Sequence, residues 1–214
     1  MLQVIKESFI LFVACGVGGY SFKELNGFLK ISCFQVVLGM VNYAGARAVT
    51  IYQKSHDLPL NNQWVFNIYI LLECGLLLWA GYVYFNNKRA GRYIIAGFVI
   101  FLVIYVYQLS KQGFLLFANY AFLTEGIVTV SIYIFILFGS VVKRQPPRRI
   151  KPEFWLSLGL IMYFAGNVPY MGLVHYFQKL SADLNTLLFY FITDVLGNLR
   201  YLMAAISFWL YAKQ

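Results

Sequence analysis

Seven apolar stretches, most of them about twenty residues long, follow one another along the chain and limit what it can fold into. An α-helix needs roughly 20 apolar residues to cross the ~30 Å hydrocarbon core of a bilayer. Of the 214 residues, 61% are hydrophobic and only 12% are charged, whereas a soluble domain carries about a quarter charged residues. We therefore predict an all-α, polytopic membrane helical bundle of about seven transmembrane helices.

The connections between these stretches are short, so a single transmembrane helical domain over 1–214 is expected. The predicted helices cover about 4–22, 28–52, 64–85, 93–109, 117–142, 154–177 and 185–212. The first stretch is the weakest, because Lys6, Glu7 and several glycines interrupt it. If it does not span, six helices remain and both termini lie inside.

The basic residues are distributed unevenly among the connections. The connections after predicted helices 1, 3 and 5 carry two, three and five Lys or Arg, whereas those after helices 2, 4 and 6 carry one each: Lys54, Lys111 and Lys179. Cytoplasmic loops collect basic residues, so the N-terminus is predicted outside and the C-terminus inside. The net charge of +9 is thus explained by membrane topology and does not indicate nucleic-acid binding. We expect a multi-pass protein of the cell membrane, specifically a bacterial inner membrane.

Cysteine and histidine give no pattern for a metal site. Cys15, Cys33 and Cys74 each lie inside an apolar stretch and are expected to be small buried hydrophobes. His56 and His175 lack a defined third ligand, and no Cys-x-x-Cys pair occurs. The sequence therefore predicts no metal and no catalytic residue, and it leaves any cofactor unknown.

Polar residues inside the predicted helices are the candidates for function, since a charge within the bilayer is costly and requires a partner or a cavity. Several of them fall within about ten residues of the predicted outer boundary, which indicates one polar layer in the outer half of the bundle. Its members are Tyr43, Arg47, Tyr69, Glu73, Glu125, Asn167, Asp194 and Asn198.

Their spacing adds detail. Tyr69 and Glu73 are four residues apart and share a helix face, as Asp194 and Asn198 are expected to do. Pro169 lies inside the sixth helix, where its ring displaces a backbone hydrogen bond and should kink the helix. The kink would free a backbone acceptor near the depth of the carboxylates.

Two interpretations of this layer remain open. The polar groups could satisfy one another and only hold the helices together, or they could line a pocket open to the outer face. In favour of a pocket, three carboxylates face one arginine, Arg47, and Arg200 lies deeper and could pair with one acid. At least one acid is then protonated or requires another cation.

The most basic connection is a second candidate site. Its charged residues are Lys143, Arg144, Arg148, Arg149 and Lys151. A cluster of this kind beside a membrane helix attracts anionic lipid headgroups or a cytosolic partner. It could also serve only to set the topology.

A resemblance concerns most of the chain. The segments 61–69 leading to Glu73, 154–157 with 163–167, and 206–209 resemble recurring segments of small uncharacterised bacterial membrane proteins. That family has no established activity, so the resemblance implies a fold but no mechanism.

Three classes of function follow as hypotheses. The first is a binding, signalling or complex-forming membrane subunit that takes a small ligand from the outer side or docks on a larger membrane complex. The second is a small proton-coupled transporter that uses the buried carboxylates as relays. A third is an intramembrane enzyme acting on lipid. The inner half of the bundle is mostly apolar apart from Gln35, Ser131 and Arg200, which favours binding over transport.

Overall fold

Short polar segments end one helix and begin the next. Asn26 and Asn87 precede two helices, and their side chains accept hydrogen bonds from backbone N–H groups of the first turn, as N-cap residues do. Asn86 ends the preceding helix with φ 43°, a left-handed conformation that asparagine tolerates. Pro152 begins another helix, where its missing N–H removes no hydrogen bond.

The computed structural model describes residues 2–142 and 151–214, and within these ranges the regular structure is entirely helical. The predicted helical bundle is thus confirmed. Its elements are α1 (Leu2–Ser21), α2 (Gly27–Ser55), α3 (Gln63–Phe85), α4 (Lys88–Gln112), α5 (Asn119–Val142), α6 (Pro152–Leu180), α7 (Ala182–Tyr190), the π-helical turn η1 (Phe191–Leu196) and α8 (Gly197–Ala212).

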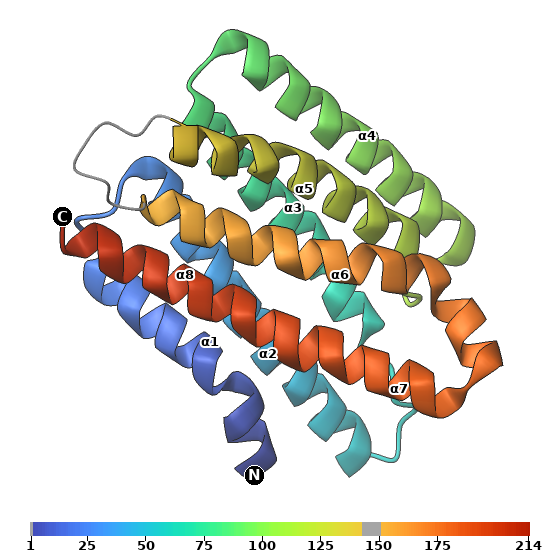
Figure 1. Cartoon of the computed structure of the whole chain (residues 1–214). Coiled ribbons are helices and arrows are strands. Elements are labelled where there is room, and N and C mark those ends of the chain that lie inside the picture. The colour runs from blue at the N-terminus through green and yellow to red at the C-terminus, as the bar shows by residue number, and fades with distance from the viewer. Residues whose placement is uncertain (1, 143–150) are drawn as a thin grey trace.

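The helices form a ring (Figure 1). Each of α1 to α6 packs against the helix that follows it in the chain, except that α6 packs on both α7 and α8, and α8 returns to pack on α1. The helix α3 also contacts α5 across the ring. Residues of α2, α3, α5, α6 and α8 therefore meet in the interior.

The outer surface of the ring is apolar. Val99, Val103 and Val106 of α4, for example, are all exposed. Contiguous apolar surface of this extent is rare on soluble proteins and matches a hydrocarbon environment. Six helical segments are long and apolar enough to cross a membrane: Gly27–Ser55, Gln63–Phe85, Lys88–Gln112, Asn119–Gly139, Pro152–Val174 and Asp183–Ala212.

The first helix is the exception. Its apolar described part, Phe9–Ser21, is shorter than these six segments, so a seventh crossing stays a prediction. The two termini nevertheless lie at opposite ends of the bundle (Figure 1). The orientation of the bundle in a membrane likewise remains a prediction.

The α4–α5 connection is held to α3 by one buried side chain, Asn67. Its amide nitrogen donates to the carbonyl oxygens of Phe114 and Leu116, each at 2.8 Å, and its amide oxygen accepts from the N–H of Ala118 at 2.9 Å. All of its side-chain hydrogen-bonding groups are used within the protein. Asn67 thereby fixes the start of α5, and with it the position of Glu125.

Candidate functional site

The centre of the ring is occupied by the carboxylate of Glu73, which has no exposed surface. Its Oε1 atom accepts hydrogen bonds from Nε2 of Gln35 and from the hydroxyl of Tyr69, both at 2.7 Å. Nη2 of Arg200 also donates to Oε1 in a buried ion pair. Side chains from three helices, α2, α3 and α8, thus donate hydrogen bonds to one oxygen atom.

Arg200 is enclosed on its other sides by aromatic rings. The guanidinium carbon lies 4.7 Å from the ring centre of Tyr163 and 5.3 Å from that of Tyr201, distances at which a cation is attracted to the face of the ring. The arginine is 3% exposed. A buried charge of this kind is tolerated only when it is paired and hydrogen-bonded, so Glu73 and Arg200 stabilise each other.

This arrangement corrects the assignment of the arginine. The sequence analysis placed Arg47 in the polar layer as the cation facing the acids, and Arg200 below it. In the structure Arg47 is exposed on α2, and Glu73 pairs with Arg200. Glu73 and Arg200 each lie twelve residues before the end of their helices, at Phe85 and Ala212, hence at the same depth of about 18 Å.

Two glycines allow the helices around this centre to approach closely. A Cβ atom at Gly159 of α6 would lie 2.8 Å from Cβ of Met203 and 3.2 Å from the backbone oxygen of Arg200. A Cβ atom at Gly126 of α5 would overlap the side chain of Val168 of α6. The absence of a side chain at these positions brings α6 against α8 beside Arg200, and α5 against α6 beside Glu125.

Glu125 is the unusual member of the cluster. It has no exposed surface, and neither of its carboxyl oxygens has a hydrogen-bond partner among the described residues. Glu73 and Arg200 lie within electrostatic range of Glu125. Arg200 forms its ion pair with Glu73, so a negative charge on Glu125 would have no partner among the described residues and would be very costly.

Further buried polar atoms lack partners within the described part of the chain. They include Oε2 of Glu73, Nε of Arg200 and the hydroxyls of Thr129, Ser157 and Ser207. Ser157 and Ser207 lie five residues from the ends of α6 and α8 that neighbour each other, about 8 Å along each helix. Buried groups without partners are few in native proteins and call for an explanation.

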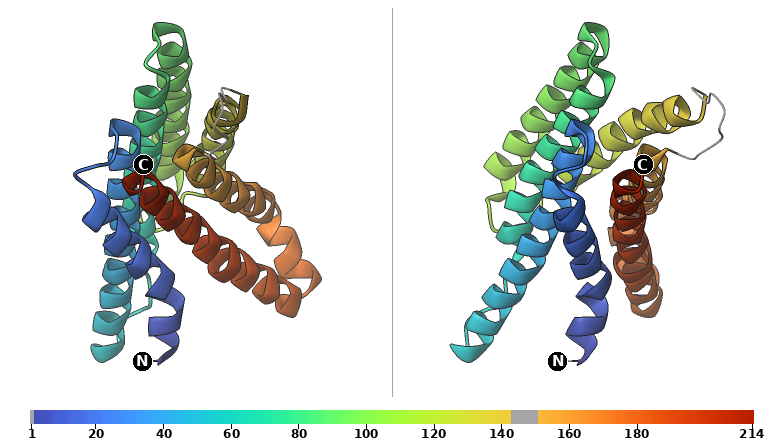
Figure 2. Two further views of the ribbon diagram at one scale, coloured as in Figure 1. Left: turned by 60° about the vertical axis from the view of Figure 1, so that its left-hand side comes forward. Right: turned by 90° about the vertical axis from the view of Figure 1, so that its left-hand side faces the viewer.

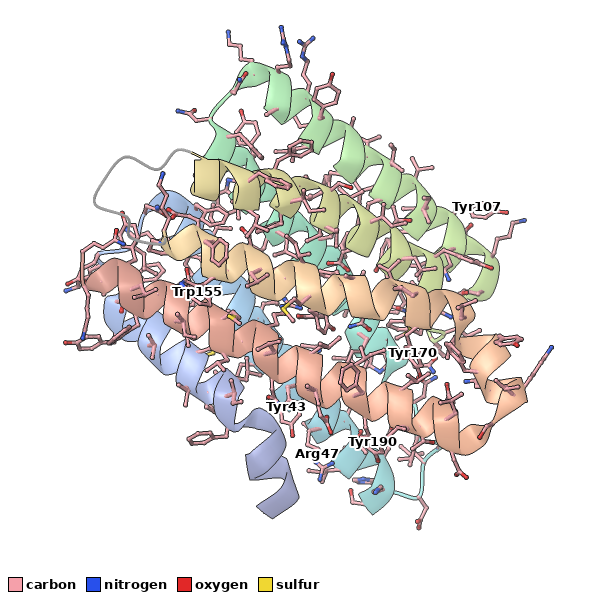
Figure 3. The ribbon with its side chains drawn as sticks, in the orientation of Figure 1. Tyr43, Arg47, Tyr107, Trp155, Tyr170 and Tyr190 are labelled. Atoms are coloured by element: carbon pink, nitrogen blue, oxygen red, sulfur yellow. The ribbon has the colours of Figure 1, made fainter. Side chains whose placement is uncertain are left out.

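Asn167 and Tyr43 take supporting positions. Asn167 is buried, and its amide donates to the backbone oxygen of Tyr163, one turn earlier, at 3.4 Å. Tyr43 is half-buried and packs against the hydrophobic core from α2. Figure 3 shows Tyr43, Arg47 and Tyr190 in the part of the bundle where the N-terminus of the chain lies.

The last predicted helix contains a feature that the sequence analysis missed. Residues Phe191–Leu196 form a π-helical turn, which needs more residues per revolution than an α-helix. Asp194 lies within this turn, half-buried, with the hydroxyl of Thr193 donating to it at 3.4 Å, and Asn198 is also half-buried.

Pro169 lies inside α6, as the sequence indicates. Figure 1 shows α6 turning away from its initial direction in its second half, before it reaches α7. Both views of Figure 2 show α6, α7 and α8 diverging from α2 and α3 toward the N-terminal end of α1. Pro169 of α6 and the π-helical turn η1 thus lie in the part of the bundle that diverges from α2 and α3.

Of the predicted basic cluster, Lys143, Arg144, Arg148 and Arg149 lie outside the described residues. Lys151 is exposed and immediately precedes α6.

The cluster around Glu73 is closed in the structure, because Glu73 and Glu125 have no exposed surface and Asn167 only 3%. Two open grooves, of about 330 and 400 Å³, lie elsewhere, on the outer faces of α2, α3 and α4, and their walls are apolar. The sequence analysis expected a polar pocket open to the outer face. Glu73 and Glu125 do lie in the interior, but in a closed cluster, and Asp194 is half-buried in η1.

The ring of long apolar helices with a charged, buried centre defines the class of the molecule, a polytopic helical membrane protein. Comparisons with protein-family models, curated proteins and solved structures found no match in any of the three. This outcome is consistent with the resemblance to a family that has no established activity.

Proposed function

We propose that this membrane protein is a binding module whose interior cluster takes a small ligand carrying a cationic or hydrogen-bond-donating group. The observation that carries the proposal is Glu125, a fully buried carboxyl group without a hydrogen-bond partner in the described residues. Arg200, the arginine of the cluster, forms its ion pair with Glu73. The cluster thus has one acid in excess, and an amine or similar donor would compensate it.

The atoms without partners define the chemistry of such a ligand. Acceptors predominate, namely both oxygens of Glu125 and Oε2 of Glu73, whereas Nε of Arg200 is a donor. A ligand that supplies donors to these oxygens would remove the cost of leaving buried acceptors unpaired. The same chemistry disfavours a purely anionic ligand.

Access to the cluster would require the helices to separate. The kink at Pro169 in α6 and the π-helical turn in η1 lie on neighbouring elements, and π-turns occur frequently at functional sites. Movement of α6 to α8 away from α2 and α3 would open the interior from the end at which these elements already diverge (Figure 2). That end is the predicted outer side.

The test is a thermal-shift screen of the purified protein in detergent against small amines: monoamines, diamines, amino alcohols and quaternary ammonium compounds. A ligand that binds only the folded protein raises its midpoint temperature according to its concentration relative to Kd. We expect at least one of these classes to stabilise the wild type and to lose its effect in Glu125→Gln. Glu24→Gln, at an exposed acid between α1 and α2, is the matched control. No shift in any class, or an equal shift in Glu125→Gln, would refute the proposal.

A proton-coupled carrier is the second candidate, and one observation favours it. The unpartnered hydroxyls of Ser157 and Ser207 continue the line of buried polar groups from Glu125 toward the other end of the bundle. A carrier predicts that the protein, reconstituted in vesicles, dissipates an imposed proton gradient in the presence of its substrate, and that Glu125→Gln does not. A binding module leaves the gradient intact in both variants.

A further inference from the structure

The outer face of the ring carries a continuous apolar groove that the interior cluster does not use. It consists of two adjoining hollows of about 330 and 400 Å³, which share Gly75 of α3 and Phe98 of α4. Along α3 it extends from Leu71 to Tyr82, about 16 Å at 1.5 Å per residue. That is about half of the ~30 Å hydrocarbon core, the depth of one lipid leaflet.

Gly75 opens the middle of this groove. A Cβ atom at Gly75 would have no heavy atom within 4 Å, so the glycine is not required for close packing of the helices. The groove lies within two segments that are long and apolar enough to span, Gln63–Phe85 and Lys88–Gln112. In a membrane, the groove would therefore face the hydrocarbon of the bilayer.

One end of the groove leads to a basic turn. Tyr82 and Ile94 line that end, and Lys88, Arg89 and Arg92 follow in the first turns of α4, all exposed. None of the three has a carboxylate partner in the described ranges, and α4 contains no acidic residue. Three cations thus lie at the end of the groove that would be at the surface of a bilayer.

The packing of the turn brings these charges close to the groove. A Cβ atom at Gly91 would lie 2.7 Å from the ring of Tyr82, so the glycine lets this ring pack directly against the start of α4. The N-terminus of a helix also favours negative charge through its unpaired N–H groups. The apolar groove fits a long apolar chain, and the basic residues and the helix N-terminus beside it fit an anionic head. Together they match a molecule that has both parts.

We propose that the groove between α3 and α4 binds one anionic phospholipid, with an acyl chain along Gly75 and the phosphate on Lys88, Arg89 and Arg92. Anionic lipids are attracted to basic residues at the cytoplasmic membrane surface, which is where the predicted topology places this turn. A zwitterionic lipid would make the same chain contacts without the charge complementarity.

The experiment is native mass spectrometry of the purified full chain, titrated with phosphatidylglycerol or with phosphatidylcholine of the same acyl chains. The wild type should retain one phosphatidylglycerol in preference to phosphatidylcholine. The triple variant Lys88→Gln/Arg89→Gln/Arg92→Gln should weaken phosphatidylglycerol binding by at least about tenfold and abolish the preference. Its matched control removes three exposed cations at the opposite end of the bundle: Lys54→Gln/Lys111→Gln/Lys179→Gln.

The apolar half of the site is tested separately. A Cβ atom at Gly75 has open space around it, so the side chain of Gly75→Leu should project into the groove. The protein should fold normally and lose retention of both lipids. Gly16→Leu on α1, which also has open space around it, should keep the wild-type behaviour.

Three outcomes would overturn the proposal. If the control triple variant weakened phosphatidylglycerol binding equally, the lipid would be held only by diffuse attraction to the positive charge of the protein. Full retention by Gly75→Leu would mean that no acyl chain lies in the groove. A dimer in the wild type that Gly75→Leu dissociates would mean that a second copy of the chain covers this face.

Discussion

Removing the charge of Arg200 should be the most damaging single change in the bundle. In Arg200→Met the carboxylate of Glu73 stays in the interior with only Gln35 and Tyr69 as hydrogen-bond donors. Breaking a buried ion pair by deleting one partner costs about 3–5 kcal/mol. The contacts of the guanidinium with the rings of Tyr163 and Tyr201 are lost too, and each is worth about 0.5–2 kcal/mol. We expect a total loss of about 4 kcal/mol or more.

A double-mutant cycle separates the contribution of the Glu73–Arg200 ion pair from that of the packing around Arg200. Glu73→Gln alone leaves Arg200 buried without its counter-charge, so it should also destabilise by about 3 kcal/mol. The double variant Arg200→Met/Glu73→Gln leaves no buried charge from the pair and should recover about 2–3 kcal/mol relative to the sum of the single losses. The assay is reversible unfolding in mixed micelles with increasing denaturing detergent, followed by far-ultraviolet circular dichroism.

Arg47→Met serves as the matched control, because the same substitution is made at an exposed arginine. Exposed substitutions usually change stability by less than about 0.5 kcal/mol. Additive losses in the double variant, or an Arg47→Met variant as unstable as Arg200→Met, would refute the assignment of the ion pair.

Three further predictions concern single positions. Tyr69→Phe should cost about 1.5–3 kcal/mol by the same unfolding assay, because it removes a hydrogen bond to the central carboxylate; a change within error would show that the bond contributes nothing. Gly159→Ala should cost about 1–3 kcal/mol, since its methyl group meets the backbone of the facing helix, while Gly16→Ala in open space should not destabilise. A single cysteine at Lys54 should react with an impermeant thiol reagent in intact cells, and one at Lys88 should react only after permeabilisation; the reverse would contradict the predicted orientation.

The helical bundle and the central acid were predictable from the sequence because both rest on local patterns. Apolar stretches of membrane length identify the spans without knowledge of their packing. Glu73 is conspicuous as a charge within such a stretch, and its bond to Tyr69 follows from a four-residue spacing in one helix. Neither inference requires knowing which helices are neighbours.

The sequence analysis placed Arg47 beside the acids and Arg200 below them because it depended on depth. Counted from the outer boundary, Glu73 is nine residues deep and Arg200 about fifteen, which suggested different layers. Counted from the other ends of their helices, both are at twelve residues. The final helical segment is 30 residues long, against 23 for α3, so it extends further beyond the outer boundary and shifts the count. The presence of an arginine near the middle of the last apolar stretch was the sequence signal that could have identified it.

The π-helical turn was not predictable for a different reason. Nothing in the sequence Phe191–Leu196 marks a departure from α-helical hydrogen bonding, since no proline or glycine lies within it. A π-helical turn contains more residues per revolution than an α-helix, so the residues that follow it are rotated relative to their positions in a regular α-helix.

Because α8 closes the ring against α1, the order of synthesis limits the order of assembly. Glu73 is made 127 residues before Arg200, and so enters the membrane while its counter-ion does not yet exist. The donors that precede it in the chain, Gln35 and Tyr69, are neutral, and they can hold a carboxyl group in either protonation state. We expect chains truncated before α7 to insert but to be cleared by proteases, and in pulse-labelled cells protease resistance should arise only once α8 has left the ribosome. Resistance acquired with α6 would show that the bundle is stable before its first and last helices meet.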